Sequence, residues 1–165
     1  MSKTALVTGA SEGIGAEFAK ILANLGYDLI LVARSEDKLN QLADRLRSEF
    51  EVNSAVIVAD LSKANAAQDL FQNVEEIGAK VDFLINNAGL LQNGFFTKLS
   101  LKKQEAMISV NVMALTSLTH LFANKMALQG SGHILNVASL AGWMGIPNQN
   151  VYAASKAYVV SFSQA

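Results

Sequence analysis

The chain has no cysteine, one proline and only 16% charged residues among its 165 residues. Without cysteine there is no disulfide framework, no thiolate nucleophile and no cysteine-based metal site. The formal net charge of −1 gives little attraction to nucleic acid or to an anionic membrane. No apolar run approaches the roughly 20 residues that a membrane span requires. We therefore expect neither a nucleic-acid partner nor a membrane partner.

Patterns that bind metals are also missing from the sequence. The two histidines, His120 and His133, have no partner at a spacing typical of a metal site or of a catalytic triad. Packing or surface positions are the better interpretation of both side chains. We expect no metal site.

Apolar residues are abundant, at 51% of the chain, which favours buried parallel strands over disorder. A length of 165 residues suits a single domain over residues 1–165. The first predicted strand begins at Lys3, which leaves no room for a signal peptide. We expect a cytoplasmic protein.

Predicted strands and helices alternate along the whole chain. The strands cover residues 3–8, 28–33, 54–59, 81–85 and 133–138, and the helices cover 16–25, 38–49, 63–77, 102–129 and 151–165. Ser35 is placed to cap the second helix. Alternation of this kind indicates right-handed crossovers and a parallel sheet covered on both faces. We expect an α/β, doubly wound, Rossmann-type sheet with strand order 3-2-1-4-5.

A glycine-rich turn joins the first strand to the first helix, and it also contains Ser11 and Ile14. Free N–H groups and the helix dipole at such a helix start favour a phosphate. Gly9 permits a tight turn, Gly13 lets the backbone approach a pyrophosphate, and Gly15 allows the helix and the strand to pack closely. A glycine-rich connection without a ligand is the alternative.

A serine, a tyrosine and a lysine near the end of the chain suggest proton-transfer chemistry. Tyr152 and Lys156 are four residues apart, so a helix would place both side chains on one face, one turn apart. An ammonium beside a phenol favours the ionised form of the phenol, which then exchanges a proton more readily near neutral pH. Ser139 could hold the substrate oxygen through its hydroxyl. Reduction of a carbonyl or oxidation of an alcohol requires these functions.

Six motifs in order make the chain resemble the short-chain dehydrogenase/reductase family over its whole length. They are residues 8–15 (TGASEGIG), Asp60-Leu61, residues 86–89 (NNAG), Asn111, Ser139, and Tyr152 to Lys156 (YAASK). The residues around the tyrosine are similar to the branch of ketoacyl and hydroxysteroid reductases. The resemblance implies an oxidoreductase that transfers a hydride between a nicotinamide cofactor and a carbonyl or secondary alcohol. It also implies a homodimer or homotetramer that assembles through the long helix and the tyrosine helix.

The resemblance and the motifs together give a set of site residues. The catalytic residues are Asn111, Ser139, Tyr152 and Lys156, and the cofactor-binding residues are Gly9, Ser11, Gly13, Ile14, Gly15, Arg34, Asp60, Leu61, Asn87, Tyr152 and Lys156. Lys156 is also expected to hold the nicotinamide ribose. Asn111 is expected to anchor a water that links Lys156 to solvent, which requires a bend in the long helix.

Several of these residues have structural alternatives. The resemblance implies that Asp60 touches the adenine, but an aspartate after a strand also commonly caps a turn. Asn87 is expected at the cofactor, while Asn86 is expected to steady the central sheet. Both amides could equally hold backbone groups together without touching a ligand.

The end of the second strand favours NADP(H) over NAD(H), without excluding NAD(H). A carboxylate there would bind the ribose 2′-hydroxyl of NAD, but the strand ends at Ala33. Arg34 follows, and a guanidinium suits a 2′-phosphate. A solvated loop charge is the alternative interpretation of Arg34. Glu12 opposes the preference, because family members that prefer NADP often carry a basic residue at its position.

The family usually runs to ~250 residues, as other single α/β domains do. The resemblance therefore implies that the usual last two strands are absent and that residues 1–165 end within the helix carrying Tyr152 and Lys156. An inert or merely cofactor-binding fragment of such an enzyme is the alternative to an active reductase.

Overall fold

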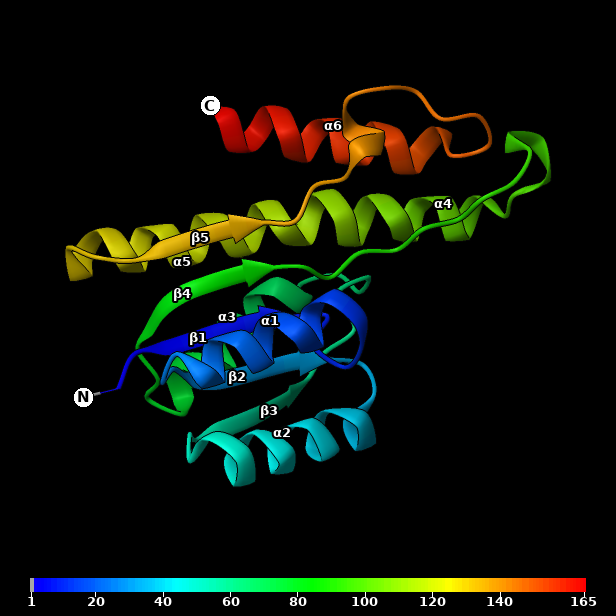
Figure 1. The fold of residues 1–165 in the computed structure, drawn as a ribbon. Helices are drawn as coiled ribbons and strands as arrows, with labels where there is room; N and C mark the ends of the chain where they lie inside the picture. Colours follow the sequence, from blue (N-terminus) through cyan, green and yellow to red (C-terminus); the bar gives the residue numbers. More distant parts are fainter. Residues whose placement is uncertain (1) are drawn as a thin grey trace.

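The computed structural model describes residues 2–165, which form a five-stranded parallel sheet with helices on both faces (Figure 1). The strands are β1 (Thr4–Thr8), β2 (Asp28–Ala33), β3 (Ser54–Val58), β4 (Val81–Asn86) and β5 (His133–Asn136). Their order is β3-β2-β1-β4-β5, and each neighbouring pair is parallel. The predicted doubly wound fold and strand order are confirmed.

Helices α1 (Gly13–Asn24) and α2 (Glu36–Phe50) cover one face of the sheet. Alternate residues of the central strands, such as Val7 and Leu31, are fully buried and share a core with Leu39 of α2. Successive side chains of a strand point to opposite faces. The intervening residues of the same strands therefore belong to a second core.

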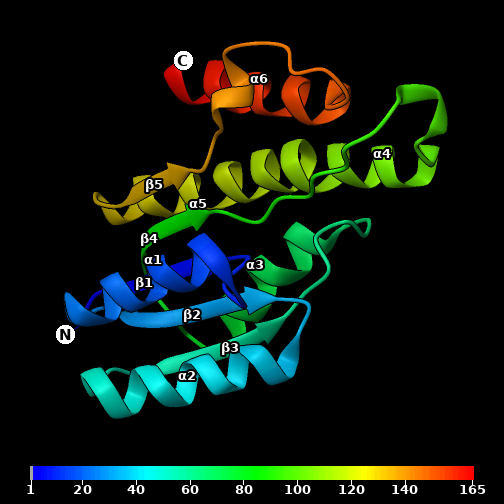
Figure 2. The same ribbon diagram turned by 45° about the vertical axis from the view of Figure 1, so that its right-hand side comes forward.

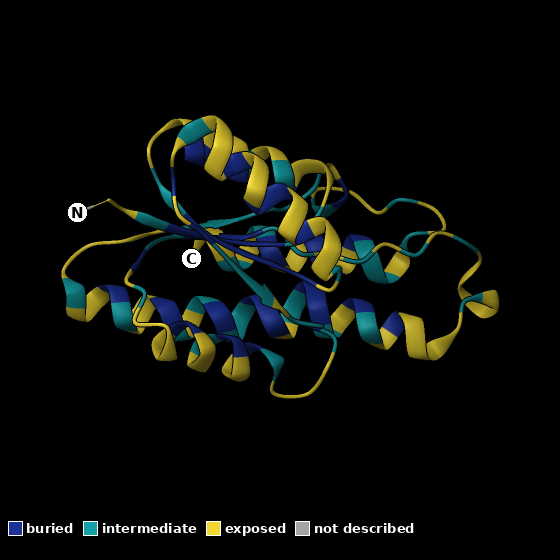
Figure 3. Ribbon diagram, turned by 90° about the horizontal axis from the view of Figure 1, so that it is seen from below, coloured by how far each residue is buried: buried dark blue, intermediate teal, exposed yellow. Residues whose placement is uncertain are grey.

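The second core lies on the opposite face, beneath α3 (Ala66–Glu76) and α5 (Leu115–Gln129), as a turned view shows (Figure 2). Leu6 and Ile30 pack there with Phe122 of α5. Both central strands are therefore buried on both sides, and the outward faces of the helices carry most of the exposed residues (Figure 3). This arrangement leaves the strand ends as the place for a ligand.

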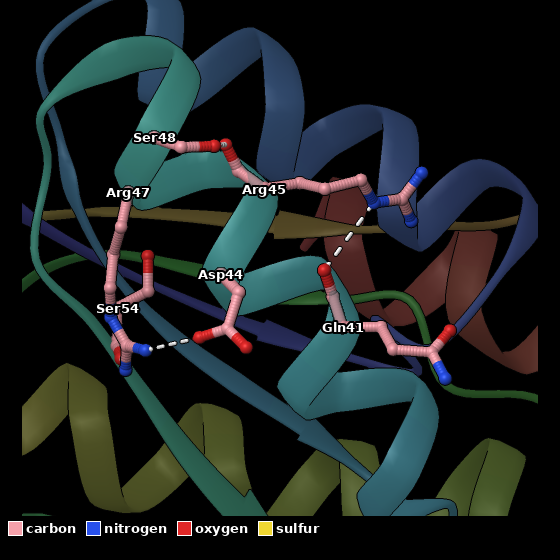
Figure 4. A network of polar contacts seen from close by, with 6 residues as sticks. All are labelled: Gln41, Asp44, Arg45, Arg47, Ser48 and Ser54. Atoms are coloured by element: carbon pink, nitrogen blue, oxygen red, sulfur yellow. Dashed lines mark hydrogen bonds and ion pairs between the residues drawn. The ribbon is translucent and has the colours of Figure 1, made fainter.

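Polar contacts fix the end of α2 to the start of β3 (Figure 4). Arg47 lies 2.8 Å from the carboxylate of Asp44 and also donates to the carbonyl of Ser54. At the other end of α2, Ser35 occupies the N-cap position, but its side chain makes no capping hydrogen bond. The predicted position of Ser35 at the start of the helix is therefore correct, but the predicted capping by its side chain is wrong.

One long helix runs from Leu101 to Gln129, close to the predicted range 102–129. It comprises α4 (Leu101–Ile108), a π-helical segment η2 (Ser109–Ala114) and α5. The π-helical turn lies at Asn111, where the sequence predicts a bend, and π-bulges are a known cause of helix irregularity. The regular helical ladder is therefore interrupted beside a predicted site residue.

The same helix is long and apolar enough to cross a membrane by length and composition, with a mean hydropathy of 1.5 over its most apolar window. This feature was not predicted from the sequence, because threonines, serines and an asparagine interrupt the apolar residues. The core helix of a soluble protein has the same properties. In this fold the helix packs against α3 and β4, and 39% of that window is buried.

Several element boundaries differ from their predictions. Helix α3 begins at Ala66 and not at residue 63, because Asn65 adopts a left-handed conformation with φ of 62°. Strand β5 ends at Asn136 and not at residue 138. Two short 3₁₀ turns, η1 (Phe96–Lys98) and η3 (Leu140–Gly142), were not predicted. Helix α6 (Asn150–Gln164) follows and packs on η3, α4 and η2.

Candidate active site

The glycine turn after β1 has the geometry that the sequence predicts. Gly9 has φ of +67°, and a Cβ on it would lie 2.9 Å from the Cα of Ala88. A Cβ on Gly15 would lie only 2.2 Å from the carbonyl oxygen of Gly9, so the helix packs closely on the turn. Gly13 is different, because nothing lies within 4 Å of its Cβ position. The start of α1 is thus accessible, as a phosphate-binding helix start must be.

A cavity of about 450 Å³ opens beside this turn, at the carboxyl ends of β1 to β4. Most of the predicted cofactor residues line it: Gly9, Ser11, Ile14, Arg34, Asp60, Leu61 and Asn87. Its wall also contains Glu12, Val32, Ala33, Ser35, Lys38, Ala59, Ala88, Gly89, Leu90 and Val110. The remaining predicted residues, Gly13, Gly15, Tyr152 and Lys156, lie outside this wall.

Asn87 braces the turn from the end of β4. Its Nδ2 donates to the carbonyl oxygens of Thr8, at 3.0 Å, and Gly9, at 3.2 Å. The Thr8 hydroxyl accepts from the backbone N–H of Asn87 at 3.0 Å and donates to Ile85. These bonds match the structural alternative for Asn87. A role in touching the cofactor stays a prediction.

Asn86 is buried and holds neighbouring elements together. Its Nδ2 donates to Thr119 of α5 at 3.0 Å and to the side-chain oxygen of Asn136 in β5 at 2.9 Å. These contacts suit the expected part of Asn86 in steadying the sheet.

Asp60 caps a turn at the end of β3. Its carboxylate accepts from the hydroxyl of Ser62 at 2.7 Å and from the backbone N–H of Ser62 at 3.1 Å. The Ser62 hydroxyl is the largest cause that lowers the pKa of Asp60, and the positive charges of Arg34 and Lys63 lower it further. The turn-capping alternative is therefore satisfied, and the same carboxylate also faces the cavity. Its predicted contact with adenine stays a prediction.

Lys156 is buried, with 5% of its surface exposed, and its position is fixed. Its Nζ donates to the carbonyl of Val137, just beyond β5, at 2.6 Å. The same Nζ lies 5.9 Å from the centre of the Tyr152 ring. Burial lowers the pKa of the ammonium below its ordinary value of 10.5. The predicted placement of Tyr152 and Lys156 on one side of the helix therefore holds in the structure.

Gly89 links the cavity to this pair. It lines the cavity, and its Cβ position lies 3.7 Å from the Lys156 Nζ and 3.5 Å from the Asn111 Oδ1. The absence of a side chain at Gly89 keeps the space between the cavity and the ammonium open. The sequence motif contains Gly89, but only the fold shows its position beside Lys156.

The side-chain amide of Asn111 forms hydrogen bonds to neighbouring residues of the protein. Its Nδ2 donates to the carbonyl of Leu90 and to the hydroxyl of Ser155, each at 3.0 Å, while its Oδ1 accepts from the Leu90 N–H at 2.8 Å. Ser155 in turn donates to the carbonyl of Tyr152 at 2.7 Å. Both hydrogens of the Asn111 amide are thus engaged. The predicted water link would need another atom of this residue and stays a prediction.

Ser139 is the N-cap residue of η3, and its side-chain oxygen accepts from the N–H of Ala141 at 3.2 Å. This bond leaves the hydroxyl proton free to donate to a ligand. The turn packs tightly on α6, since a Cβ on Gly142 would lie 2.7 Å from the carbonyl oxygen of Lys156. The loop that carries Ser139 and the helix that carries Tyr152 are therefore packed together.

Three residues near the site were not predicted from the sequence: Ser155, Gly142 and Lys38. Ser155 stands within the tyrosine motif, which was a usable signal. Gly142 and Lys38 gave no signal, because their neighbours come from other elements. Among residues 2–165 no group of three or more histidine, cysteine or acidic side chains could hold a metal ion.

The cavity suits a dinucleotide on structural grounds. Gly13 leaves open space at a helix start, and a strand-end cavity lined by backbone, basic, acidic and apolar groups runs from there to the neighbourhood of Lys156. A pyrophosphate would be held by the glycine turn, and an adenosine by the side with Arg34, Asp60 and Leu61. The residues present therefore fit the predicted cofactor.

Comparison with known proteins gives one family. The profile described as short chain dehydrogenase matches residues 3–165. A ketoacyl reductase, HetN, of a Nostoc species is 36% identical over 163 residues, which cover 99% of this chain and 56% of that protein. An acetoacetyl-CoA reductase of an Acinetobacter species is 38% identical over 167 residues, which cover 99% of this chain and 66% of that protein.

A solved structure agrees with the sequence matches. The short-chain dehydrogenase from Sphingobium yanoikuyae in complex with NADPH is 38% identical, with a TM-score of 0.92 over 98% of this chain and 63% of that one. This chain spans 69%, 56%, 52% and 53% of the length of the first four curated relatives that it matches.

Proposed function

This chain belongs to the short-chain dehydrogenase family, and we propose that it transfers a hydride between NADP(H) and a carbonyl or secondary alcohol substrate. The observation that carries the proposal is the position of the Lys156 ammonium. It lies beside the Tyr152 ring and borders, through Gly89, the cavity that suits the dinucleotide. Residues 1–165 would act as one dinucleotide-binding domain.

Each residue has a separate task in this proposal. When bound, the nicotinamide supplies or accepts the hydride. Tyr152 donates a proton to the carbonyl oxygen as that oxygen gains negative charge. Ser139 donates its free hydroxyl proton as a hydrogen bond to the same oxygen and orients it. Lys156 places its ammonium beside the Tyr152 ring and would hold the nicotinamide ribose.

The backbone of the site is held by the polar contacts of Asn111. Its amide joins Leu90 of the cavity wall to Ser155, which in turn binds the carbonyl of Tyr152. A side chain fixed in this way has less freedom to lose when a substrate binds. Asn111 therefore supports the catalytic tyrosine through Ser155, as a positioning residue.

The preference for NADP(H) rests on the wall of the cavity at the end of β2. Ala33 offers no carboxylate for a ribose 2′-hydroxyl, and Arg34 offers a guanidinium for a 2′-phosphate. The solved relative bound to NADPH supports this choice. NAD(H) remains the alternative cofactor.

We also infer self-association through the long helix and α6, which carry exposed apolar side chains. Met113 of the long helix is 62% exposed. Tyr158 of α6 is 37% exposed, and its hydroxyl lies 2.8 Å from the hydroxyl of Thr116 in α5. These side chains place an apolar surface across two adjacent helices. A homodimer or homotetramer would cover that surface, and a cytoplasmic location stays a prediction.

A chain that binds the cofactor without turnover, or an inert one, is the second candidate function. Calorimetric titration with NADPH separates a binding chain from an inert one. NADPH consumption with a panel of ketones, including 3-oxoacyl thioesters, then separates an enzyme from a binder. Binding without consumption of NADPH by any ketone would contradict the proposed reaction.

A further inference from the structure

An ion pair crosses the cavity wall between the glycine turn and α2. The Nζ of Lys38, in the first turn of α2, lies 2.5 Å from the Oε2 of Glu12, the N-cap residue of α1. Both residues line the cavity. The Lys38 and Glu12 side chains are 53% and 72% exposed. Solvent therefore reaches the pair, and a ligand group can take the place of either side chain.

We propose that Lys38 is a second cation for the ribose 2′-phosphate, and that Glu12 is its internal counter-ion, displaced when NADP(H) binds. This inference rests on the proposed function and identifies the residues that set its cofactor preference. In the free protein Glu12 holds the lysine at the cavity wall. With NADP(H), the more highly charged phosphate takes the place of the carboxylate. With NAD(H), which lacks the phosphate, the Glu12–Lys38 pair stays intact.

The placement of the basic side chains supports this exchange. Arg34, Ser35 and Lys38 line the same cavity at the junction of β2 and α2. The hydroxyl of Ser35 is not used to cap α2, so it too is free for a phosphate oxygen. A 2′-phosphate at the end of β2 would meet these three side chains and no carboxylate from the strand itself, which ends at Ala33.

The charge balance explains why one cation would be insufficient. Arg34 already lies close enough to Asp60 for its charge to act on that carboxylate. A phosphate monoester carries between one and two negative charges near neutral pH. Lys38 supplies the second positive charge, and an exposed ion pair such as Glu12–Lys38 is held weakly enough to open.

Glu12 opposes the preference for NADP(H) that Arg34 favours. A carboxylate in the glycine turn opposes phosphate binding in two ways, by direct repulsion and by occupying Lys38. Substitution of each partner, alone and together, separates these two effects. A purely structural link between α1 and α2 would affect both cofactors equally.

The experiment titrates the full chain with NADPH and with NADH by calorimetry at one fixed ionic strength. The variants are Lys38→Gln, Glu12→Gln and the double variant, and Lys20→Gln, an exposed position on α1 outside the cavity wall, is the control for lost charge. Lys38→Gln should weaken NADPH binding about tenfold, as loss of a charge-assisted hydrogen bond does, and leave NADH unchanged. Glu12→Gln should tighten NADPH about threefold, within the range of an exposed pair.

The double variant tests the coupling. Removal of Glu12 should tighten NADPH much less when Lys38 is already absent. An equal gain in both backgrounds would mean direct repulsion alone and would overturn the counter-ion role. Unchanged NADPH binding in Lys38→Gln, or equal weakening of NADPH and NADH, would overturn the inference as a whole. Failure of the unsubstituted chain to bind either dinucleotide would instead contradict the proposed function.

Discussion

Lys156 combines a positive charge with near-complete burial. A buried ammonium is disfavoured by loss of water, and the hydrogen bond to the Val137 carbonyl compensates for only part of that loss. The result is a pKa below 10.5, caused by burial. The hydrogen bond to Val137 fixes this ammonium next to the Tyr152 ring and at the edge of the cavity. Burial of the charged Lys156 side chain therefore lowers the free energy of unfolding.

A pH dependence of stability follows from this lowered pKa. Between the folded pKa of Lys156 and 10.5, the unfolded chain binds more protons than the folded one, so stability rises with pH in that window. Below the folded pKa both states are protonated, and Lys156 contributes no slope. Lys156→Met keeps the aliphatic stem and removes the titration. Urea unfolding of both proteins from pH 7 to pH 10 should therefore show the wild type gaining stability relative to the variant.

Two outcomes would contradict this prediction. A wild type that loses stability relative to Lys156→Met as the pH rises would show that the ammonium is favoured by its surroundings. A constant difference across the range would show that burial does not alter its titration there. Lys103→Met, at an exposed position of α4, serves as the control for the loss of a lysine side chain.

At the scale of elements, the glycine turn fixes how α1, β1 and β4 meet. The Cβ position of Gly15 falls 2.2 Å from the Gly9 carbonyl oxygen and 2.5 Å from the Asn87 Nδ2. Backbone cannot move away from such a clash without shifting the strand. Gly13 has open space at the same position, and only its φ of +57° disfavours a side chain. The two glycines therefore have different physical reasons for being glycine.

Gly15→Ala should destabilise the fold by about 3 kcal/mol, at the upper end for an overpacked core, even though alanine favours helix. Gly13→Ala should cost about 1–2 kcal/mol, the strain of a left-handed residue. Gly26→Ala, also in open space with φ of +79°, is the matched control for Gly13. Thermal and urea unfolding measure all three, and an equal effect of Gly13→Ala and Gly15→Ala would refute the packing argument.

Element order was predictable because local patterns carry it. Apolar β-branched runs define the strands, and Gly26, Gly78 and Gly130 end helices in left-handed conformations, as expected from their positions. The crossover rule makes the connections right-handed, and the doubly wound arrangement typical of such domains supplies the sheet order. The start of α3 was not predictable, because Asn65 takes a left-handed conformation that glycine more often adopts.

The candidate site was predictable where motifs name single residues and unpredictable where two elements meet. The pairing of Tyr152 with Lys156 follows from helical spacing. The pair of Glu12 and Lys38 joins residues 26 positions apart, on two helices whose mutual placement no local pattern specifies. The contact of Gly142 with the backbone of Lys156 has the same origin. Such contacts arise only from tertiary packing.

At the scale of the whole molecule, the long helix has one face in the core and one outside it (Figure 3). Leu118 and Phe122 of this helix are buried, whereas its Met113 and Leu128 are 62% and 88% exposed. Exposed apolar surfaces of adjacent helices are common sites of association. The proposed dimer or tetramer would place this face against a second copy.

Met113→Glu should weaken this association, because a carboxylate at an apolar contact must be desolvated. Leu25→Glu, at a 66% exposed apolar position after α1 and away from the long helix, is the matched control. Sedimentation velocity over a range of concentrations measures both. We expect the assembly to shift toward smaller species in Met113→Glu alone. Equal shifts in both variants, or a monomeric wild type, would contradict assembly through this face.

The most direct test of the whole account compares binding with turnover in Tyr152→Phe. This change removes only the phenolic hydroxyl, so the ring beside Lys156 and the cavity wall remain. We predict a loss of NADPH-dependent ketone reduction of about a hundredfold or more, the contribution of a general acid, with NADPH binding nearly unchanged by calorimetry. Retained turnover, or loss of turnover together with loss of NADPH binding, would contradict the assignment of Tyr152 as the proton donor.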